Sequence, residues 1–206
     1  VYDLLAEAYF GDHPLARPIL GTNDQIASVT REALLAFRQK HYRPDNMVLA
    51  IAGQFDMEEF HALAEKLLGG WHAEGETHIP APVKGTKPRV LTRKKDIEQV
   101  HMCLAFPGVQ QDEDDLYPIS VMNNLFGGGM SSRLFQRIRE EMGAVYSVYS
   151  FPSTYTNCGT FTVYAGTSPE TAQKVADELH HQIRLLCENG VTQEEFEMAK
   201  EQLKVS

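Results

Sequence analysis

The sequence predicts a fold that combines helices with strands, at least two of which pair antiparallel. Apolar residues recur at helical spacing in several segments, for example after Asp56. Two apolar stretches, 144–151 and 159–165, flank a turn that contains proline and asparagine, which indicates an antiparallel hairpin. Between 73 and 88 the chain has three prolines, two glycines and little to bury, so we expect a linker between two parts.

The first part of the chain is expected to be mostly helical. The loop 11–21 has two prolines and two glycines, which break regular structure. The residue before Pro44 avoids the α region and ends a helix, and the apolar run 47–52 is typical of a buried strand. The expected elements are a helix over 2–10, a helix from Thr30 to Arg43, a strand over 47–52 and a helix from Asp56, capped with the help of Glu59, to Gly69.

The second part is expected to alternate strands and helices. Pro169 suits the first position of a helix, and Thr192 with Glu195 forms a capping box. The expected strands are 89–92, 97–106, 144–151 and 159–165, and the expected helices are 114–125, 131–142 and one each from Ser168 and Thr192. The strands 47–52 and 160–165 both end in Ala-Gly before a capped helix. This echo indicates two related domains, or it has arisen by chance.

Composition and charge exclude several classes of protein. The formal net charge of −9, from 19 basic and 28 acidic side chains, disfavours nucleic acid as a partner. No apolar run reaches the roughly 18 residues that cross a bilayer, so we expect no membrane span. The 3 cysteines are widely spaced without Cys-x-x-Cys, which fits a reducing compartment, and we expect a soluble, cytoplasmic protein.

Common catalytic motifs are missing from the sequence. The 8 histidines include no pair at i, i+4 spacing around a glutamate, so no metal centre is expected. The run Gly127–Gly129 follows a helix and lacks the Gly-Lys-Ser/Thr ending of a phosphate-binding loop. It is either a flexible connection or a mobile loop beside a substrate channel. There is no Gly-x-Ser-x-Gly, and we expect Ser131 and Ser132 to cap the next helix.

Arg139 and Tyr146 form the candidate site. They lie seven residues apart across Gly143, so a helix-to-strand turn can bring a guanidinium near a phenol. Such a pair can bind main-chain carbonyl groups, and we expect both side chains to open on one cavity. The alternative is that Arg139 pairs with a carboxylate, as surface arginines often do, and that Tyr146 packs in the sheet.

Three motifs occur in order along nearly the whole chain. They are HPLARPILGT from His13, HYRPDNMVLA from His41 and GGGMSSRLFQRIRE from Gly127, with Gly143 and Tyr146 following. With these motifs the chain resembles the M16 family of zinc metallopeptidases, which includes the mitochondrial processing peptidase, insulin-degrading enzyme and compact bacterial processing proteases.

The resemblance implies an α+β fold. Each half of such a protein has an antiparallel sheet with flanking helices, and two related halves close around an unfolded peptide. On this basis 1–75 is the C-terminal part of the zinc-bearing domain, and 76–95 is the interdomain linker. The range 96–206 is the N-terminal part of the second, substrate-binding domain, which is inactive.

The resemblance also implies zinc in the intact protein, with none bound by this chain. Relatives hold the metal with both histidines of His-x-x-Glu-His, whose glutamate is the general base, and with a distal glutamate. The sequence contains none of these ligands. The distal glutamate is expected just before Val1, and Glu7 lies outside the matching pattern. The chain begins in an apparent helix without methionine, so we expect a piece of a longer protein.

Two functions follow from the resemblance. The first is part of a zinc endopeptidase that cleaves peptides or presequences in an enclosed chamber. In active relatives an arginine and a tyrosine at the positions of Arg139 and Tyr146 contact the substrate backbone and the transition state. The alternative is a non-catalytic partner subunit or structural core protein. The expected partners are a peptide or unfolded polypeptide and a second M16 chain, as a homodimer or a paired subunit.

Overall fold

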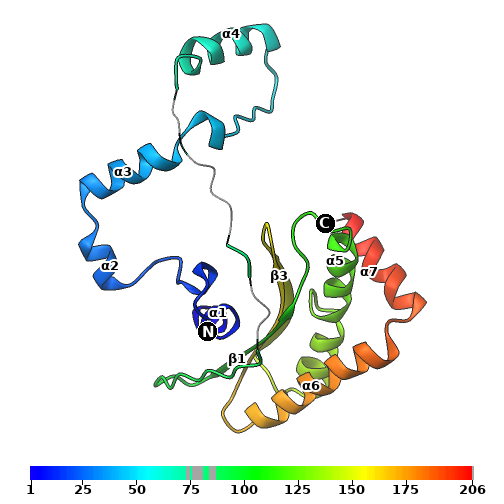
Figure 1. The fold of residues 1–206 in the computed structure, drawn as a ribbon. Helices are drawn as coiled ribbons and strands as arrows, with labels where there is room; N and C mark the ends of the chain where they lie inside the picture. Colours follow the sequence, from blue (N-terminus) through cyan, green and yellow to red (C-terminus); the bar gives the residue numbers. More distant parts are fainter. Residues whose placement is uncertain (73–74, 76–80, 84–86, 206) are drawn as a thin grey trace. The chain divides into compact units, whose positions relative to one another are not determined.

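The computed structural model describes residues 1–72, 75, 81–83 and 87–205 (Figure 1). The chain divides into two compact units. Unit 1 contains Val1–Pro18 and Pro80–Ser206, and unit 2 contains Ile19–Ile79. Much of the predicted linker 76–95 lies outside the described residues, and its described part forms no helix or strand. The assignment of the two ranges to an M16 zinc domain and a second domain stays a prediction.

A three-stranded antiparallel sheet forms the centre of unit 1. Its strands are β1 (Val100–Pro107), β2 (Ser147–Thr154) and β3 (Gly159–Thr167), in the order β1-β3-β2. Val163 of β3 pairs with Leu104 of β1 and with Ser150 of β2. The hairpin predicted from the sequence is therefore confirmed, although β2 begins later than expected.

The first face of the sheet carries the hydrophobic core. It packs against α5 (Leu116–Phe126), η3 (Phe135–Glu141), a π-helix, and α6 (Ala172–Asn189). Figure 1 shows α5 and α6 on the same side of the sheet. Full burial stabilises each large apolar side chain by roughly 1.5–3 kcal/mol. The cluster contains Phe126, Leu134, Ile138, Ala144, Val148, Phe161, Val163, Ala165, Val175 and Leu179.

The second face of the sheet packs against α1 (Tyr2–Phe10). The Tyr2 ring lies 5.9 Å from the Phe151 ring and 6.0 Å from the Tyr164 ring, measured between centroids. A short helix, η1 (Pro14–Ala16), follows α1 in the same unit. Because successive residues of a strand alternate between faces, the second face holds the side chains that the core leaves out.

The last helix, α7 (Gln193–Val205), packs against α5. Asn124 Nδ2 donates to the main-chain oxygen of Ala199, at 3.2 Å. The predicted capping box is confirmed, because the Glu195 N–H donates to Thr192 Oγ1 and the Thr192 N–H donates to Glu195 Oε2.

Unit 2 contains α2 (Asn23–Ser28), α3 (Arg31–His41), η2 (Pro44–Asn46) and α4 (Met57–Leu68). The predicted cap at Asp56 is confirmed, because its carboxylate accepts from the Glu59 N–H. Thr30 also caps α3, by accepting from the Ala33 N–H. The predicted strand 47–52 is wrong. The segment pairs with no strand among the described residues, and Val48 is 94% exposed. A strand needs a neighbour for its main-chain hydrogen bonds, and the described part of the chain supplies none.

Other expectations for unit 1 need correction. The segment 89–92 is not a strand, and α6 begins at Ala172, after a turn at Ser168–Thr171, so Pro169 precedes the helix. Ser132 is buried, and its hydroxyl has no hydrogen-bond partner in the described part of the chain. It therefore does not cap the following helix through its side chain.

Within the described ranges no helix combines the length and apolar character that spanning a membrane requires.

Candidate functional site

Arg139 lies near the end of η3. Its Nη1 donates a hydrogen bond to the main-chain oxygen of Tyr146, at 2.9 Å. The guanidinium carbon lies 5.2 Å from the centre of the Phe135 ring, within the range of a cation–π contact. Among the described residues Arg139 has no ion-pair partner. Its neighbours do have partners, Arg133 with Glu195 and Arg137 with Glu141 and Glu178.

Gly143 makes the turn between η3 and β2 possible. Its φ of +57° lies in the left-handed region, which costs a residue with a Cβ about 1–2 kcal/mol. The Gly143 N–H donates to the oxygen of Arg139 at 3.2 Å, and the Ala144 N–H donates to the oxygen of Ile138 at 3.1 Å. The Ala144 oxygen in turn accepts from the buried hydroxyl of Thr167. These bonds tie the turn to the helix on one side and to β3 on the other.

Tyr146 has a fixed main chain and an exposed phenol. Its N–H donates to the oxygen of Gly166 at 2.8 Å, and its own oxygen accepts from Arg139. Tyr146 is 58% exposed, so it is not packed in the sheet as the alternative interpretation requires. The structure therefore brings Arg139 to the main chain of Tyr146, with both side chains on the surface.

The pair can bind an acceptor of hydrogen bonds. A guanidinium has five N–H donors, and one of those of Arg139 is used on Tyr146. The others, and the phenol of Tyr146, have no hydrogen-bond partner within the described ranges. Main-chain carbonyl oxygens of a peptide are acceptors that such donors match. That both side chains open on one cavity stays a prediction.

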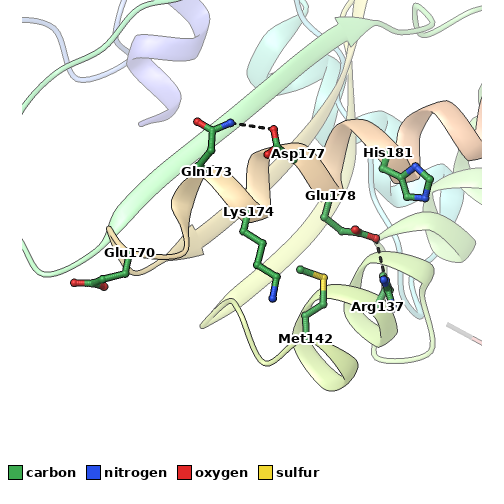
Figure 2. Close-up of a pocket in the computed structure, with 8 residues that line it drawn as sticks. All are labelled: Arg137, Met142, Glu170, Gln173, Lys174, Asp177, Glu178 and His181. Carbon is green, nitrogen blue, oxygen red and sulfur yellow. Dashed lines mark hydrogen bonds and ion pairs between the residues drawn. The ribbon is translucent and has the colours of Figure 1, made fainter.

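A pocket lies elsewhere, between η3 and α6 (Figure 2). Arg137 Nε donates to Glu178 Oε1 at 3.0 Å, and Gln173 Nε2 donates to Asp177. Burial opposes ionisation of Glu178, but hydrogen bonds from Gln182 and Arg137 outweigh it and lower the pKa of this carboxyl. The lining residues are Arg137, Met142, Glu170, Gln173, Lys174, Asp177, Glu178 and His181. Neither Arg139 nor Tyr146 is among them, so this pocket is distinct from the candidate site.

The glycine run packs closely at its start. A Cβ on Gly127 would lie 2.4 Å from Ser150 Oγ of β2, and the Ser150 N–H donates to the oxygen of Gly127 at 3.1 Å. A Cβ on Gly128 would lie 2.8 Å from Cα of Asn124. Gly129, by contrast, has open space around it. The first two glycines are thus needed for close packing, a role that the sequence did not indicate.

The second face of the sheet holds a network of hydrogen-bonded and stacked aromatic side chains that was not predicted from the sequence. The hydroxyls of Tyr2 and Tyr149 share a hydrogen bond, and the Tyr149 ring stacks on Tyr164 with centroids 4.7 Å apart. The Tyr164 hydroxyl and His101 Nδ1 form a further hydrogen bond, at 2.8 Å. Burial, followed by the bond to Tyr149, raises the pKa of Tyr2 above its usual range. Tyr149 lies opposite Tyr164 in the hairpin register. This cross-strand pairing is the feature of the sequence that could have indicated the network.

The described residues do not fit a zinc site. They contain no group of three or more histidine, cysteine, aspartate or glutamate side chains placed to hold a metal ion. Structural and catalytic zinc sites both take at least three such protein ligands.

Comparisons with known proteins cover the whole chain. The family described as the peptidase M16 inactive domain matches residues 28–203. A Bacillus subtilis protein named as an uncharacterized zinc protease is 40% identical over 207 residues, which cover 100% of this chain and 50% of that protein. A Rickettsia bellii protein with the same description is 39% identical over 205 residues, covering 99% of this chain and 49% of that protein.

Solved structures agree with the sequence comparison. A crystal structure of a peptidase M16 inactive domain from Pseudomonas fluorescens matches with a TM-score of 0.93 and 26% identity, covering 100% of this chain and 50% of that one. This chain thus spans about half the length of the curated relatives it matches. The expected family and the expected α+β fold are both confirmed. The chain belongs to the peptidase M16 family.

Proposed function

We propose that this chain is the substrate-contacting part of a zinc-dependent metalloendopeptidase that cleaves peptides or presequences in an enclosed chamber. The family and the relatives named as zinc proteases support a peptidase parent about twice as long as this chain. The observation that carries the proposal is the placement of Arg139 and Tyr146. The main chain of Tyr146 is fixed by hydrogen bonds to Arg139 and to Gly166. The remaining donors of the two side chains have no partner among the described residues.

Each side chain has a defined task in this proposal. Arg139 donates to carbonyl oxygens of an extended peptide, for which its rigid fork of donors is suited. Tyr146 donates through its phenol to the carbonyl oxygen that gains negative charge during cleavage, and its fixed main chain keeps that donor in place. Zinc is proposed for the intact protein only, because the described residues do not fit a zinc site.

The test uses the full-length parent protein and a fluorogenic peptide. Tyr146→Phe keeps the ring and removes the donor, so we expect kcat to fall by about 10²–10³-fold, as for loss of one oxyanion donor. Arg139→Lys keeps the charge and loses the fork, so we expect a loss of kcat/KM of roughly 10-fold or more. Tyr117→Phe, at an exposed tyrosine of α5, is the matched control and should leave kcat unchanged.

Unchanged activity in Tyr146→Phe would rule out the proposed role of this tyrosine. A parent protein with no chelator-sensitive activity, which co-purifies with a separate zinc-bearing chain, would favour the non-catalytic partner subunit instead. Pairing with a second M16 chain, as a homodimer or a paired subunit, and a cytoplasmic location belong to the same proposal. Light scattering on the intact protein tests the pairing.

A further inference from the structure

Gly166 of β3 connects the candidate site to the second face of the sheet. Its oxygen accepts the N–H of Tyr146 at 2.8 Å. In the sheet register it pairs with His101 of β1 and with Ser147 of β2, the residue that follows Tyr146. Any shift of Gly166 therefore moves the group that holds the main chain of Tyr146.

The missing side chain of Gly166 leaves room for a neighbouring hydroxyl. A Cβ at this position would lie 2.9 Å from the Tyr164 hydroxyl oxygen and 3.4 Å from Ser147 Oγ. The first distance is shorter than ordinary van der Waals contact, so one of the two groups would have to move. The φ of Gly166 is not positive, so alanine can adopt the same main-chain conformation without strain. Only the contact with the Tyr164 hydroxyl therefore opposes a side chain at this position.

The Tyr164 hydroxyl is not free to move aside. It forms a hydrogen bond with His101 Nδ1 at 2.8 Å, and its ring stacks on Tyr149. Tyr164 is only 8% exposed, and the hydroxyl of Tyr149 is itself bonded to Tyr2. Displacing Tyr164 therefore breaks a hydrogen bond of a nearly buried group, which is costly.

We propose that Gly166 is a positioning residue for Tyr146, and that Tyr164, fixed by His101, is the reason glycine is required there. This inference rests on the proposed role of Tyr146. A side chain at position 166 would clash with the Tyr164 hydroxyl. Because His101 and Tyr149 keep Tyr164 in place, the main chain of β3 moves instead. The Gly166 oxygen then shifts, and the phenol of Tyr146 is presented from a displaced main chain.

The experiment is a double-mutant cycle in the full-length protein. Gly166→Ala should lower kcat by about 10- to 100-fold with little change in KM, because small misplacements of a reacting group have effects of this size. Tyr164→Phe removes the hydroxyl and should cost a few-fold. The double variant should regain most of the activity lost in Gly166→Ala, because the added methyl then has space. Gly70→Ala is the control, since a Cβ at Gly70 would have no atom within 4 Å.

A second measurement is independent of peptidase activity. Amide hydrogen exchange at Tyr146 reports the bond to the Gly166 oxygen directly. We expect exchange about 10-fold faster in Gly166→Ala and near wild-type in the double variant. Unchanged exchange at Tyr146 in Gly166→Ala, or a double variant as impaired as the single one, would overturn the inference. If the parent has no peptidase activity, the exchange result still decides the positioning role.

Discussion

Cys103 illustrates how neighbours set the chemistry of a single side chain. It lies on β1 opposite Tyr164, and burial raises the pKa of its thiol to about 11. The thiolate is the nucleophilic form, so the raised pKa keeps Cys103 mostly in its unreactive thiol form at pH 8. Cys187, on α6, is exposed to solvent.

We expect alkylation to distinguish these two cysteines. With iodoacetamide at pH 8, Cys187 should react first and Cys103 should be slower by roughly two orders of magnitude, because of both burial and its raised pKa. Mass spectrometry of timed digests measures the two rates. In urea the rates should converge, and equal rates in the folded protein would contradict the environment described for Cys103.

At the scale of elements, one ion pair joins Arg133, which lies just before η3, to α7. Arg133 donates to Glu195 through Nε at 2.6 Å and through Nη2 at 2.7 Å, and the same carboxylate closes the capping box with Thr192. The hydrogen bond from Arg133 is the main cause that lowers the pKa of Glu195 to about 2. The carboxylate therefore serves both the helix end and the contact between elements.

This pair predicts a specific dependence of stability on pH. Because the folded pKa of Glu195 lies below its ordinary value of 4.5, its stabilising effect is complete above that pH and is lost as pH falls towards 2. The side chains are 22% and 26% exposed, so we expect Glu195→Gln to cost about 1–2 kcal/mol at pH 7 after solvent screening.

Urea unfolding at pH 7, 4 and 2.5 measures this effect. The difference between wild type and Glu195→Gln should shrink as the pH falls. Glu197→Gln, at a more exposed carboxylate of the same helix, should show no comparable trend. A constant difference across this range would show that the charge of Glu195 contributes little.

Elements with local signals could be predicted from the sequence, whereas those that need distant partners could not. The predicted caps at Asp56 and Thr192 involve residues within one turn, and both are present. The run 47–52 has the composition of a strand, but strand formation depends on a neighbour elsewhere in the chain. At the candidate site, the spacing of Arg139 and Tyr146 across Gly143 indicated that these two residues lie close together. The spacing did not specify that Arg139 would lie in a π-helix or that its guanidinium would donate to the main-chain oxygen of Tyr146.

At the scale of the molecule, the two units differ in what they bury. Unit 1 contains the buried apolar cluster between the sheet, α5, η3 and α6. Among the described residues of unit 2, Arg43 alone is buried, beside Asp45. Burial of apolar surface is the main favourable term in folding, so we expect most of the stability of this chain to come from unit 1.

Matched substitutions in the 206-residue chain test this difference. Leu179→Ala in α6 removes a fully buried side chain and should cost about 2–5 kcal/mol. Leu67→Ala in α4, where the leucine is 68% exposed, should change stability by less than about 0.5 kcal/mol. Urea unfolding followed by circular dichroism compares the two. Similar losses in both variants would mean that α4 is packed as tightly as α6.

The apolar run 47–52 has a practical consequence for the chain by itself. It carries no charge and no proline, it is extended at its first residue, and each of its residues is exposed to solvent. Six-residue segments of this composition are typical templates for cross-β aggregation when they are left uncovered. We therefore expect this run, more than the paired strands of unit 1, to limit how concentrated a solution of the isolated chain can become before it self-associates.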